Sequence, residues 1–440
     1  MRLPGAPRLL TPALLAGIAA LLGTTGARPA SHPARMTPAT GVNREFKRVG
    51  AVHATPNTTP TFSCQLTHPA RCYAPDQIRA AYGVQPLLDA GTDGSGRTIV
   101  LVDAYQSPTI QHDLAAFDSL FGLPDPVLNV VAPDGLTPFD QNDPTQVGWA
   151  AEITLDVEWS HVIAPGATIL LVLAKSSTDA DLASATRYAI DHNVGDVVVQ
   201  SFGEAEECMD PALVASQHAL FERATTKGIT LVASSGDFGA ALPNCDGSDL
   251  LDHPAVQTPA SDPNVTAVGG TRLFADGVTG AYDSETAWNE SLTFGAAGGG
   301  GFSILYKRPP FQAPVQKSHA RGVPDVSYNA GNEGGVLVLW SSSGLGQDLI
   351  FRFSGTSSGS AQWAGLVALT DQLRGGRVGD INKALYKLGK SRSASSYFHD
   401  ITIGNNSYPP IVGFQAVPGW DAVTGLGTPI ASSLVPKLAH

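Results

Sequence analysis

Residues 353–365 read Phe-Ser-Gly-Thr-Ser-Ser-Gly-Ser-Ala-Gln-Trp-Ala-Gly and place Ser357 behind a Gly-Thr pair, at the start of an apolar helical pattern. A serine at such a junction exposes its hydroxyl, and the free N–H groups of the first helical turn face any negative charge that forms beside it. The stretch therefore predicts a buried helix with a candidate nucleophile at its start. The alternative is that Ser357 only caps the helix, which is the commoner use of serine at this position.

Outward from this helix, short β-rich apolar runs alternate with amphipathic segments. The predicted strands are 98–102, 127–131, 168–173, 197–200, 229–233 and 265–268, and the predicted helices are 110–121, 149–161, 179–192 and 211–227. This alternation predicts an α/β fold with a mostly parallel central sheet and helices on both faces. Functional residues of such folds gather at the carboxyl ends of the strands, where 201–203 and 235–237 follow.

The composition is that of a compact globular protein with many tight loops. The 440 residues include 47 Gly and 32 Pro, and only 15% are charged. A formal net charge of -12 with 27 basic residues argues against nucleic acid or an anionic membrane as partner, since both require a basic surface. Nothing in the composition indicates an oligomer, and we expect a monomer.

The N-terminus has the pattern of an exported protein. Arg2 and Arg8 precede an apolar segment at 13–22, and small residues follow, which predicts a signal peptide over 1–27. The apolar segment is too short for a retained membrane anchor. Residues 28–61, rich in Pro, Thr and Ala, are expected to be an unstructured leader or linker, and 62–440 are expected to form the folded domain.

The four cysteines of an exported chain predict two disulfides. Three pairings are possible, and Cys64 with Cys72 and Cys208 with Cys245 are closest in sequence. Zinc is less favoured because no two cysteines have zinc-knuckle spacing.

None of the eleven histidines has a persuasive context as the base for Ser357. His161, at the end of the helix predicted at 149–161, complements the helix C-terminus. That helix also carries Glu152 and Asp156, four residues apart on one face. On a solvated helix the pair would be harmless, but in a packed helix two close carboxyl groups share protons and one pKa rises. Such a pair provides a proton acceptor and a group that orients it.

These residues, together with several other segments of the chain, match the motifs of a known protein family. They are 73–82, the Glu152/Asp156 helix, 201–203, 235–239, 299–303, 321–326, 354–357 and 419–427. In this order they resemble the sedolisin, or serine-carboxyl peptidase, family, whose fold is subtilisin-like and whose base is glutamate in place of histidine. The resemblance implies that Ser357 is the nucleophile, Glu152 the general base and Asp156 its orienting carboxyl group. It also implies that Asp237 lies in the oxyanion hole.

The implied roles demand acid pH. Glutamate in water has a pKa of about 4.3, and an aspartate donates a hydrogen bond to an oxyanion only when it is protonated. Without the resemblance, Asp237 would be interpreted as a turn aspartate that accepts backbone N–H groups.

The resemblance further implies one structural calcium ion and a substrate-binding strand. The calcium ligands would be the carboxylates of Asp400 and Asp421 and the carbonyls of Ile401, Val417 and Gly419, although loop aspartates also form simple Asx turns. Ser201 and Gly203 would lie on the strand that pairs with the substrate backbone, although a glycine there can also serve backbone geometry alone.

Three departures from the family pattern stand out. The leader is much shorter than the family's large folded propeptide, so the control of activity before secretion is open. Ala361 stands where proline is common, which a helix tolerates. Phe202 replaces the usual tryptophan, which is expected to alter the substrate cleft.

The sequence thus predicts a secreted, acid-active serine-carboxyl endopeptidase that hydrolyses protein or peptide substrates through an acyl-enzyme. The alternatives are a tripeptidyl exopeptidase of the same family, a catalytically silent secreted binding protein on the same fold, and a histidine-dependent subtilisin-type enzyme. Side-chain preference and pH optimum stay open.

Overall fold

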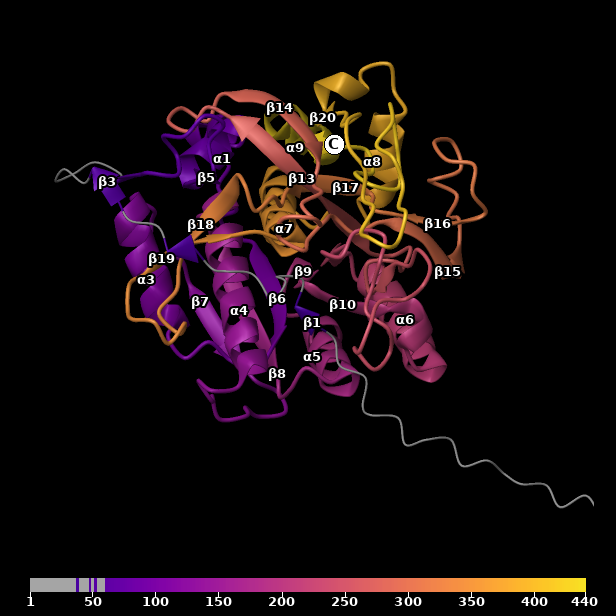
Figure 1. Cartoon of the computed structure of the whole chain (residues 1–440), viewed down its shortest axis with the longest axis horizontal. Helices are drawn as coiled ribbons and strands as arrows, with labels where there is room; N and C mark the ends of the chain where they lie inside the picture. Colours follow the sequence, from indigo (N-terminus) through magenta and orange to yellow (C-terminus); the bar gives the residue numbers. More distant parts are fainter. Residues whose placement is uncertain (1–36, 39–46, 49–50, 54–59) are drawn as a thin grey trace, which may run out of the picture. The chain divides into compact units, whose positions relative to one another are not determined.

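The computed structural model describes residues 37–38, 47–48, 51–53 and 60–440 (Figure 1). Its centre is an eight-stranded sheet of order β14-β13-β11-β9-β6-β8-β7, with β17 beside β13. These strands are β6 (Thr98–Ala104), β7 (Leu128–Val131), β8 (Thr168–Ala174), β9 (Val197–Gln200), β11 (Thr230–Ser234), β13 (Thr266–Ala275), β14 (Tyr282–Ala287) and β17 (Val326–Asn329). Every neighbouring pair except β13 and β14 is parallel, which confirms the predicted sheet.

Helices cover both faces of this sheet. Along β6, Ile99 and Leu101 pack in one hydrophobic cluster, and Val100 and Val102 pack in another, because successive side chains of a strand point to opposite faces. The first cluster contains residues of α3 (Ile110–Phe121), α4 (Pro144–Ile163) and α7 (Thr356–Arg374), and the second contains residues of α5 (Asp179–Asp191) and α6 (Pro211–Thr226). The four helices predicted from periodicity are all present.

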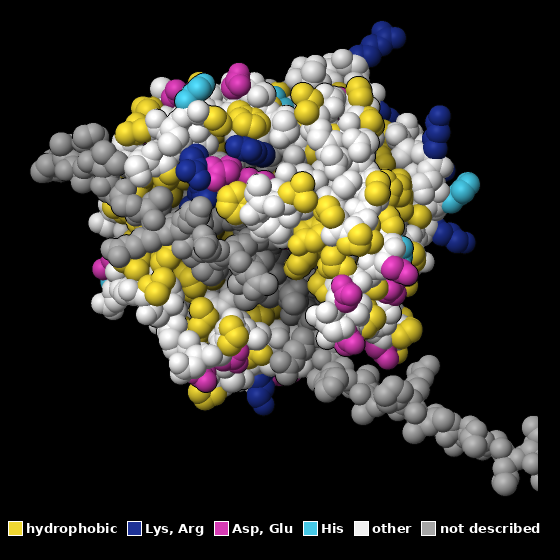
Figure 2. Space-filling model, viewed as in Figure 1, with side chains coloured by type: hydrophobic (Ala, Val, Ile, Leu, Met, Phe, Trp, Pro, Cys, Tyr) yellow, Lys and Arg dark blue, Asp and Glu magenta, His cyan; other side chains and the backbone are white. Residues whose placement is uncertain are grey.

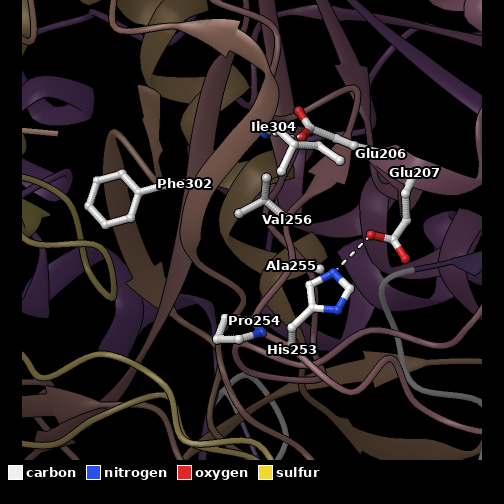
Figure 3. Close-up of a pocket in the computed structure, with 8 residues that line it drawn as sticks. All are labelled: Glu206, Glu207, His253, Pro254, Ala255, Val256, Phe302 and Ile304. Atoms are coloured by element: carbon white, nitrogen blue, oxygen red, sulfur yellow. Dashed lines mark hydrogen bonds and ion pairs between the residues drawn. The ribbon is translucent and has the colours of Figure 1, made fainter. Parts of the chain in front are cut away.

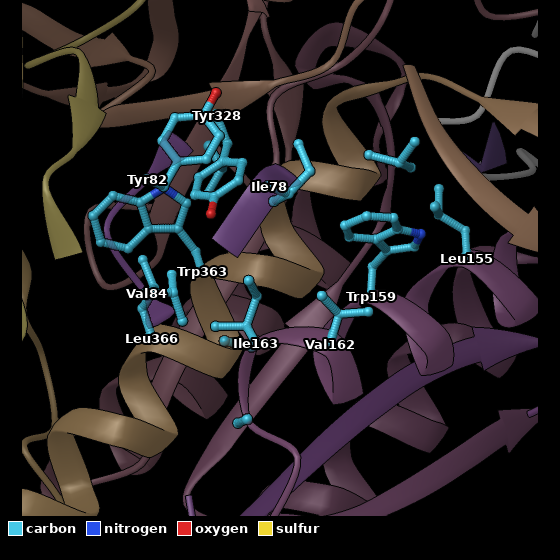
Figure 4. Packing of buried hydrophobic residues seen from close by; sticks show 14 of the residues in the cluster. Ile78, Tyr82, Val84, Leu155, Trp159, Val162, Ile163, Tyr328, Trp363 and Leu366 are labelled. Carbon is cyan, nitrogen blue, oxygen red and sulfur yellow. The ribbon is translucent and has the colours of Figure 1, made fainter. Parts of the chain in front are cut away.

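Helices α4 and α7 are in close contact (Figure 4). A Cβ atom at Gly365 of α7 would lie 2.5 Å from the Ile163 Cβ of α4, so only glycine permits this approach. Both helices end near Gly94, which precedes β6: Gly94 approaches Ala164, just after α4, and its N–H donates to Gln372 of α7 over 2.7 Å. The two helices are therefore parallel, and their first turns lie at the carboxyl edge of the sheet.

Smaller sheets surround this core, in the orders β1-β10-β12, β2-β19-β18-β5, β15-β16, β20-β21 and β3-β4. Their strands are β1 (Thr37–Pro38), β2 (Lys47–Arg48), β3 (Ala51–His53), β4 (Thr61–Phe62), β5 (Cys72–Tyr73), β10 (Phe202–Ala205), β12 (Gln257–Thr258), β15 (Gly301–Lys307), β16 (Ala320–Val323), β18 (Gly335–Leu339), β19 (Ile350–Phe353), β20 (Phe398–His399) and β21 (Thr428–Pro429). The remaining helices are α1 (Pro75–Ala81), α2 (Gln85–Asp89), α8 (Asn382–Gly389) and α9 (Ala431–Leu438).

The cysteines pair as Cys64–Cys72 and Cys208–Cys245, the pairing suggested by their closeness in sequence. The predicted signal peptide lies outside the described residues. Within the leader, β1 pairs with β10, β2 with β19 and β3 with β4, so these residues differ from the unstructured segment expected. The physical reason is that an edge strand offers unpaired N–H and C=O groups to any extended segment.

The surface agrees with the acidic composition. On the face drawn in Figure 2, lysine and arginine side chains are few and scattered among uncharged and hydrophobic ones. In the part of the chain that the structure describes, no helix has the length and apolar character needed to cross a bilayer.

Candidate active site

Ser357 lies in the first turn of α7. Gly355 is the N-cap residue, and its φ of 122° lies in a region that favours glycine. Ser357 is completely buried, and within the described residues its Oγ has no hydrogen-bond partner. A capping serine would bond a backbone N–H of its own helix, so capping does not explain this residue.

Glu152 lies on α4 at the same level as Ser357, and Asp156 lies one turn further along α4. Gly365 of α7 packs against Ser160 and Ile163 of α4. Because the helices are parallel, moving eight residues back along each one, about 12 Å, reaches Glu152 on α4 and Ser357 on α7. Both acidic side chains are completely buried. The packing of the two helices therefore brings residues two hundred positions apart to one edge of the sheet.

Ser201 connects the two helices. It follows β9, its side chain is buried, and its Oγ lies 2.9 Å from the Oγ of Ser360, one turn beyond Ser357. The same hydroxyl contacts Asp156 and opposes the rise of its pKa. The side chain of Ser201 thus serves the interior of the site, and only its backbone remains for a substrate.

Burial and mutual repulsion raise the pKa values of the acidic groups. The pKa of Asp156 is raised well above its usual range, first by burial and then by the charges of Asp103 and Glu152. The pKa of Asp103 is raised by burial and then by Glu152. Asp103, Glu152 and Asp156 therefore interact with one another and are called here the carboxyl cluster, and its two aspartates hold protons more tightly than exposed carboxylates do.

Asp103 was missed in the sequence analysis. The predicted strand ended at Val102, and Asp103 is completely buried near the carboxyl end of β6. The rule that functional groups gather at the carboxyl ends of parallel strands would have found it.

Asp237 lies beside the first turn of α7. Its Oδ1 accepts hydrogen bonds from the backbone N–H of Thr356 over 2.8 Å and from the Thr356 hydroxyl over 2.9 Å. Thr356 is adjacent to Ser357, so Asp237 is held next to the candidate nucleophile. Its partner is 119 residues away, which differs from a carboxylate that only closes its own turn.

A glycine-rich loop supports this turn from the other side. The N–H of Gly299 donates to the carbonyl of Gly236 over 2.7 Å, and the Ser235 hydroxyl donates to the Gly299 carbonyl over 2.7 Å. A Cβ atom at Gly299 would lie 2.1 Å from the Ser235 carbonyl oxygen, so only glycine fits there.

Strand β10 carries Gly203 and Phe202. The leader strand β1 pairs with its edge in antiparallel register, Thr37 opposite Gly203 and Pro38 opposite Phe202. This edge therefore accepts an extended chain. The Phe202 ring is completely buried, with its centroid 6.1 Å from that of Trp149, so its side chain packs in the core behind this strand. Ala361 lies within α7, which continues past it without interruption.

The histidine of α4 has a different neighbour. His161 Nε2 lies 3.2 Å from Asp118 Oδ1 of α3, and both side chains are buried. This contact gives no support to a histidine base for Ser357.

The residues expected to hold calcium come together in two adjacent loops. The N–H of Gly419 donates to Asp400 Oδ2 over 2.8 Å, and the N–H of Val417 donates to Asp421 Oδ2 over 2.9 Å. Within the described residues, the carbonyls of Ile401, Val417 and Gly419 accept no hydrogen bond, and there is no group of three acidic, histidine or cysteine side chains that would hold a metal. Calcium is bound by carboxylate and carbonyl oxygens, and two carboxylates with three carbonyls that accept no hydrogen bond from the described residues provide ligands of this kind.

Comparison with known proteins agrees with this arrangement. Residues 145–383 match the model of the subtilase family. Kumamolisin from Bacillus sp. (strain MN-32) is 34% identical over 380 residues, which are 83% of this chain and 63% of kumamolisin. Tripeptidyl-peptidase 1 from Dictyostelium discoideum is 28% identical over 395 residues, which are 82% of this chain and 58% of that protein. The chain thus spans less than two thirds of each relative.

Among solved structures, Pseudomonas sedolisin, a serine-carboxyl proteinase complexed with two molecules of pseudo-iodotyrostatin, has a TM-score of 0.71 and 28% sequence identity. The match covers 83% of this chain and 97% of that structure. The fold, the motif order and these similarities lead to one assignment: the chain belongs to the sedolisin, or serine-carboxyl peptidase, group of the subtilase family.

Proposed function

We propose that this protein is a secreted, acid-active serine-carboxyl endopeptidase. The observation that supports this most is the position of Ser357, whose unpartnered hydroxyl lies at the level of the buried carboxyl cluster. A serine nucleophile requires a nearby proton acceptor, and the carboxyl cluster supplies one without a histidine.

In the proposed reaction Glu152 accepts the proton of the Ser357 hydroxyl while Oγ attacks the carbonyl carbon of the substrate. Asp156 orients Glu152. Asp237, protonated at acid pH, donates a hydrogen bond to the oxyanion of the tetrahedral intermediate. Glu152 then passes its proton to the leaving amine, the C–N bond breaks, and an acyl-enzyme remains. Water hydrolyses the ester by the same steps in reverse order.

Acid pH is required because Asp103 and Asp156 must keep their protons while Glu152 is ionised. Because the pKa values of Asp103 and Asp156 are raised, both groups stay protonated to higher pH than exposed aspartates do. When both are ionised, their charges oppose the ionised state of Glu152, and the hydrogen bonding that orients it is lost. We therefore expect activity to fall as pH rises toward neutral.

An endopeptidase is favoured over a tripeptidyl exopeptidase by the leader. Strand β1, an internal segment of the chain and not a free N-terminus, lies on the edge of β10. The similarity to tripeptidyl-peptidase 1 keeps the exopeptidase as the second candidate.

Calcium and export complete the proposal. One structural calcium ion is held by Asp400, Asp421 and the carbonyls of Ile401, Val417 and Gly419, and it stabilises the loops that carry them. Export is supported by the signal-like N-terminus and by the two disulfides, which persist in oxidising compartments.

The test is hydrolysis of a denatured protein from pH 2 to pH 8. Ser357→Ala and Glu152→Gln should each abolish cleavage at every pH. Two matched controls should keep it: Ser358→Ala removes the neighbouring hydroxyl, and Glu158→Gln removes another fully buried acid of α4. Cleavage that peaks at neutral pH and survives Glu152→Gln would refute the mechanism. Release of tripeptides alone would favour the exopeptidase.

A further inference from the structure

We propose that Gln257 limits which substrate side chains this enzyme accepts next to the cleaved bond, on the amino side, and restricts that position to small residues. The inference rests on the proposed function and assigns a specificity-determining role to a residue of β12. It starts from the position of the Gln257 amide group.

The Gln257 side chain fills the space between the substrate strand and the turn that holds Asp237. A Cβ atom at Gly203 would lie 2.4 Å from the Gln257 Cδ and Nε2 atoms, and one at Gly236 would lie 2.8 Å from its Oε1 atom. The amide group therefore lies between two glycines that leave room for it. Its Nε2 donates to the carbonyl of Ser234 over 3.0 Å, which fixes its orientation.

The same space is where a substrate side chain must enter. A substrate peptide that pairs with the edge of β10 extends from there to the bond that is cleaved. The carbonyl group of this bond, which Ser357 attacks, lies beside Asp237. The residue that supplies this carbonyl then lies between Gly203 and the turn at Gly236. Its side chain meets the Gln257 amide, which is buried at 5% exposure and held by the Ser234 carbonyl.

A small hollow beside the same ribbon offers no additional room to that side chain. It is lined by Glu206, His253, Val256 and Ile304, and Figure 3 shows the ion pair of His253 with Glu207 at its margin. Val256 precedes Gln257, and consecutive side chains of an extended segment point to opposite faces. The pocket therefore lies on the other face of the β10–β12 ribbon.

The size of the effect follows from sterics. Alanine, serine and glycine have no atoms beyond the β or γ position and fit above the amide. Leucine and phenylalanine require the Gln257 side chain to leave its buried position and its hydrogen bond. When a pocket discriminates between substrates by size, one added methylene group changes kcat/KM by about 10-fold to 200-fold. We expect kcat/KM for alanine to exceed that for phenylalanine by roughly 100-fold.

The experiment compares peptides with the sequence of residues 33–44, the segment that contains β1, in which position 39 is alanine, leucine or phenylalanine. Cleavage after position 39 is identified by mass spectrometry, and kcat and KM are measured separately at acid pH. Gln257→Ala should raise kcat/KM for leucine and phenylalanine by about 10-fold to 100-fold and leave the alanine peptide within about 3-fold. Gln217→Ala, which removes another buried glutamine on α6, should leave the ratios unchanged.

Each outcome is decisive. Wild-type enzyme that cleaves phenylalanine and alanine peptides at similar rates would overturn the proposal even if Gln257→Ala did not fold. So would a Gln257→Ala enzyme that slows all three peptides equally, since this would indicate a purely structural role. If neither the peptides nor a denatured protein is cleaved at any pH, the proposed function itself fails.

Discussion

Glu204 on β10 and Asp179 at the start of α5 form a pair of carboxyl groups that makes the protein less stable as pH rises. The pKa of Glu204 is raised from 4.5 to about 8, first by burial and then by the charge of Asp179. Burial also raises the pKa of Asp179, and its contact with Glu204 opposes the rise. One proton shared between the two groups satisfies both, whereas two negative charges repel.

The sign and size of the effect follow from proton linkage. The folded protein keeps the Glu204 proton up to about pH 8, while the unfolded chain releases it above about pH 4.5, so the unfolded state binds fewer protons between these values. Stability from this group is complete below about pH 4.5 and is lost as pH rises toward about 8. At pH 7 the undiscounted loss is about 3.4 kcal/mol, since each pKa unit equals about 1.36 kcal/mol. Glu204 is only half-buried, and halving the value for solvent screening leaves about 2 kcal/mol.

Glu204→Gln removes this titration and keeps a hydrogen-bond donor for Asp179. We expect the variant to be about 2 kcal/mol more stable than its parent at pH 7 and equal to it at pH 4. Urea unfolding should be followed from pH 4 to pH 8 in a Ser357→Ala background, which prevents self-cleavage. The exposed Asp125→Asn serves as the control and should follow its parent at every pH. If Glu204→Gln and its parent lose stability in parallel between pH 4 and pH 8, the reasoning is refuted.

Three further predictions concern packing, the leader and calcium. Gly365→Ala should lower the free energy of unfolding by about 1–3 kcal/mol, because the added Cβ meets Ile163; unchanged urea midpoints would contradict the close packing of α4 and α7. A peptide of residues 30–48 should compete with a second substrate for the edge of β10 while it is cleaved itself, since β1 occupies this edge; slowing of the second substrate that an excess of that substrate does not relieve would contradict this. A calcium chelator should lower the melting temperature of the wild type, and Asp421→Asn should remove the difference; an equal response of both proteins would argue against the proposed ligands.

The sheet and its covering helices could be predicted from the sequence because their signals are local. The buried strands are continuous apolar runs, and the helix at 110–121 has the bounds that its periodicity indicates. These features depend on residues that are neighbours in the chain, so a pattern of a few residues is enough to identify them.

The contacts within the site are not local, and most of them could not be predicted. The motif order led to the prediction of Ser357, Glu152, Asp156 and Asp237 as site residues, but no pattern indicates that Gly365 sets the level of α4 against α7. The contact of Ser201 with Ser360 spans 159 positions, and the position of Gln257 depends on two glycines in separate segments. The packing of Phe202 in the core could not be predicted either, since alternation along a strand fixes which side chains share a face but not which face meets the core.

The proposed acid function and the predicted acid stability have a common physical origin in this fold. The carboxyl cluster and the Asp179–Glu204 pair both bury acidic groups beside one another, and burial is the first cause of the raised pKa of Asp103, Asp156, Asp179 and Glu204. A fold that encounters neutral pH would gain stability by replacing such groups with neutral ones. Their presence around β10 and α4 is favourable only where they hold protons. We therefore expect the pH range in which the proposed general base works to overlap the range in which these buried carboxyl groups stabilise the folded chain.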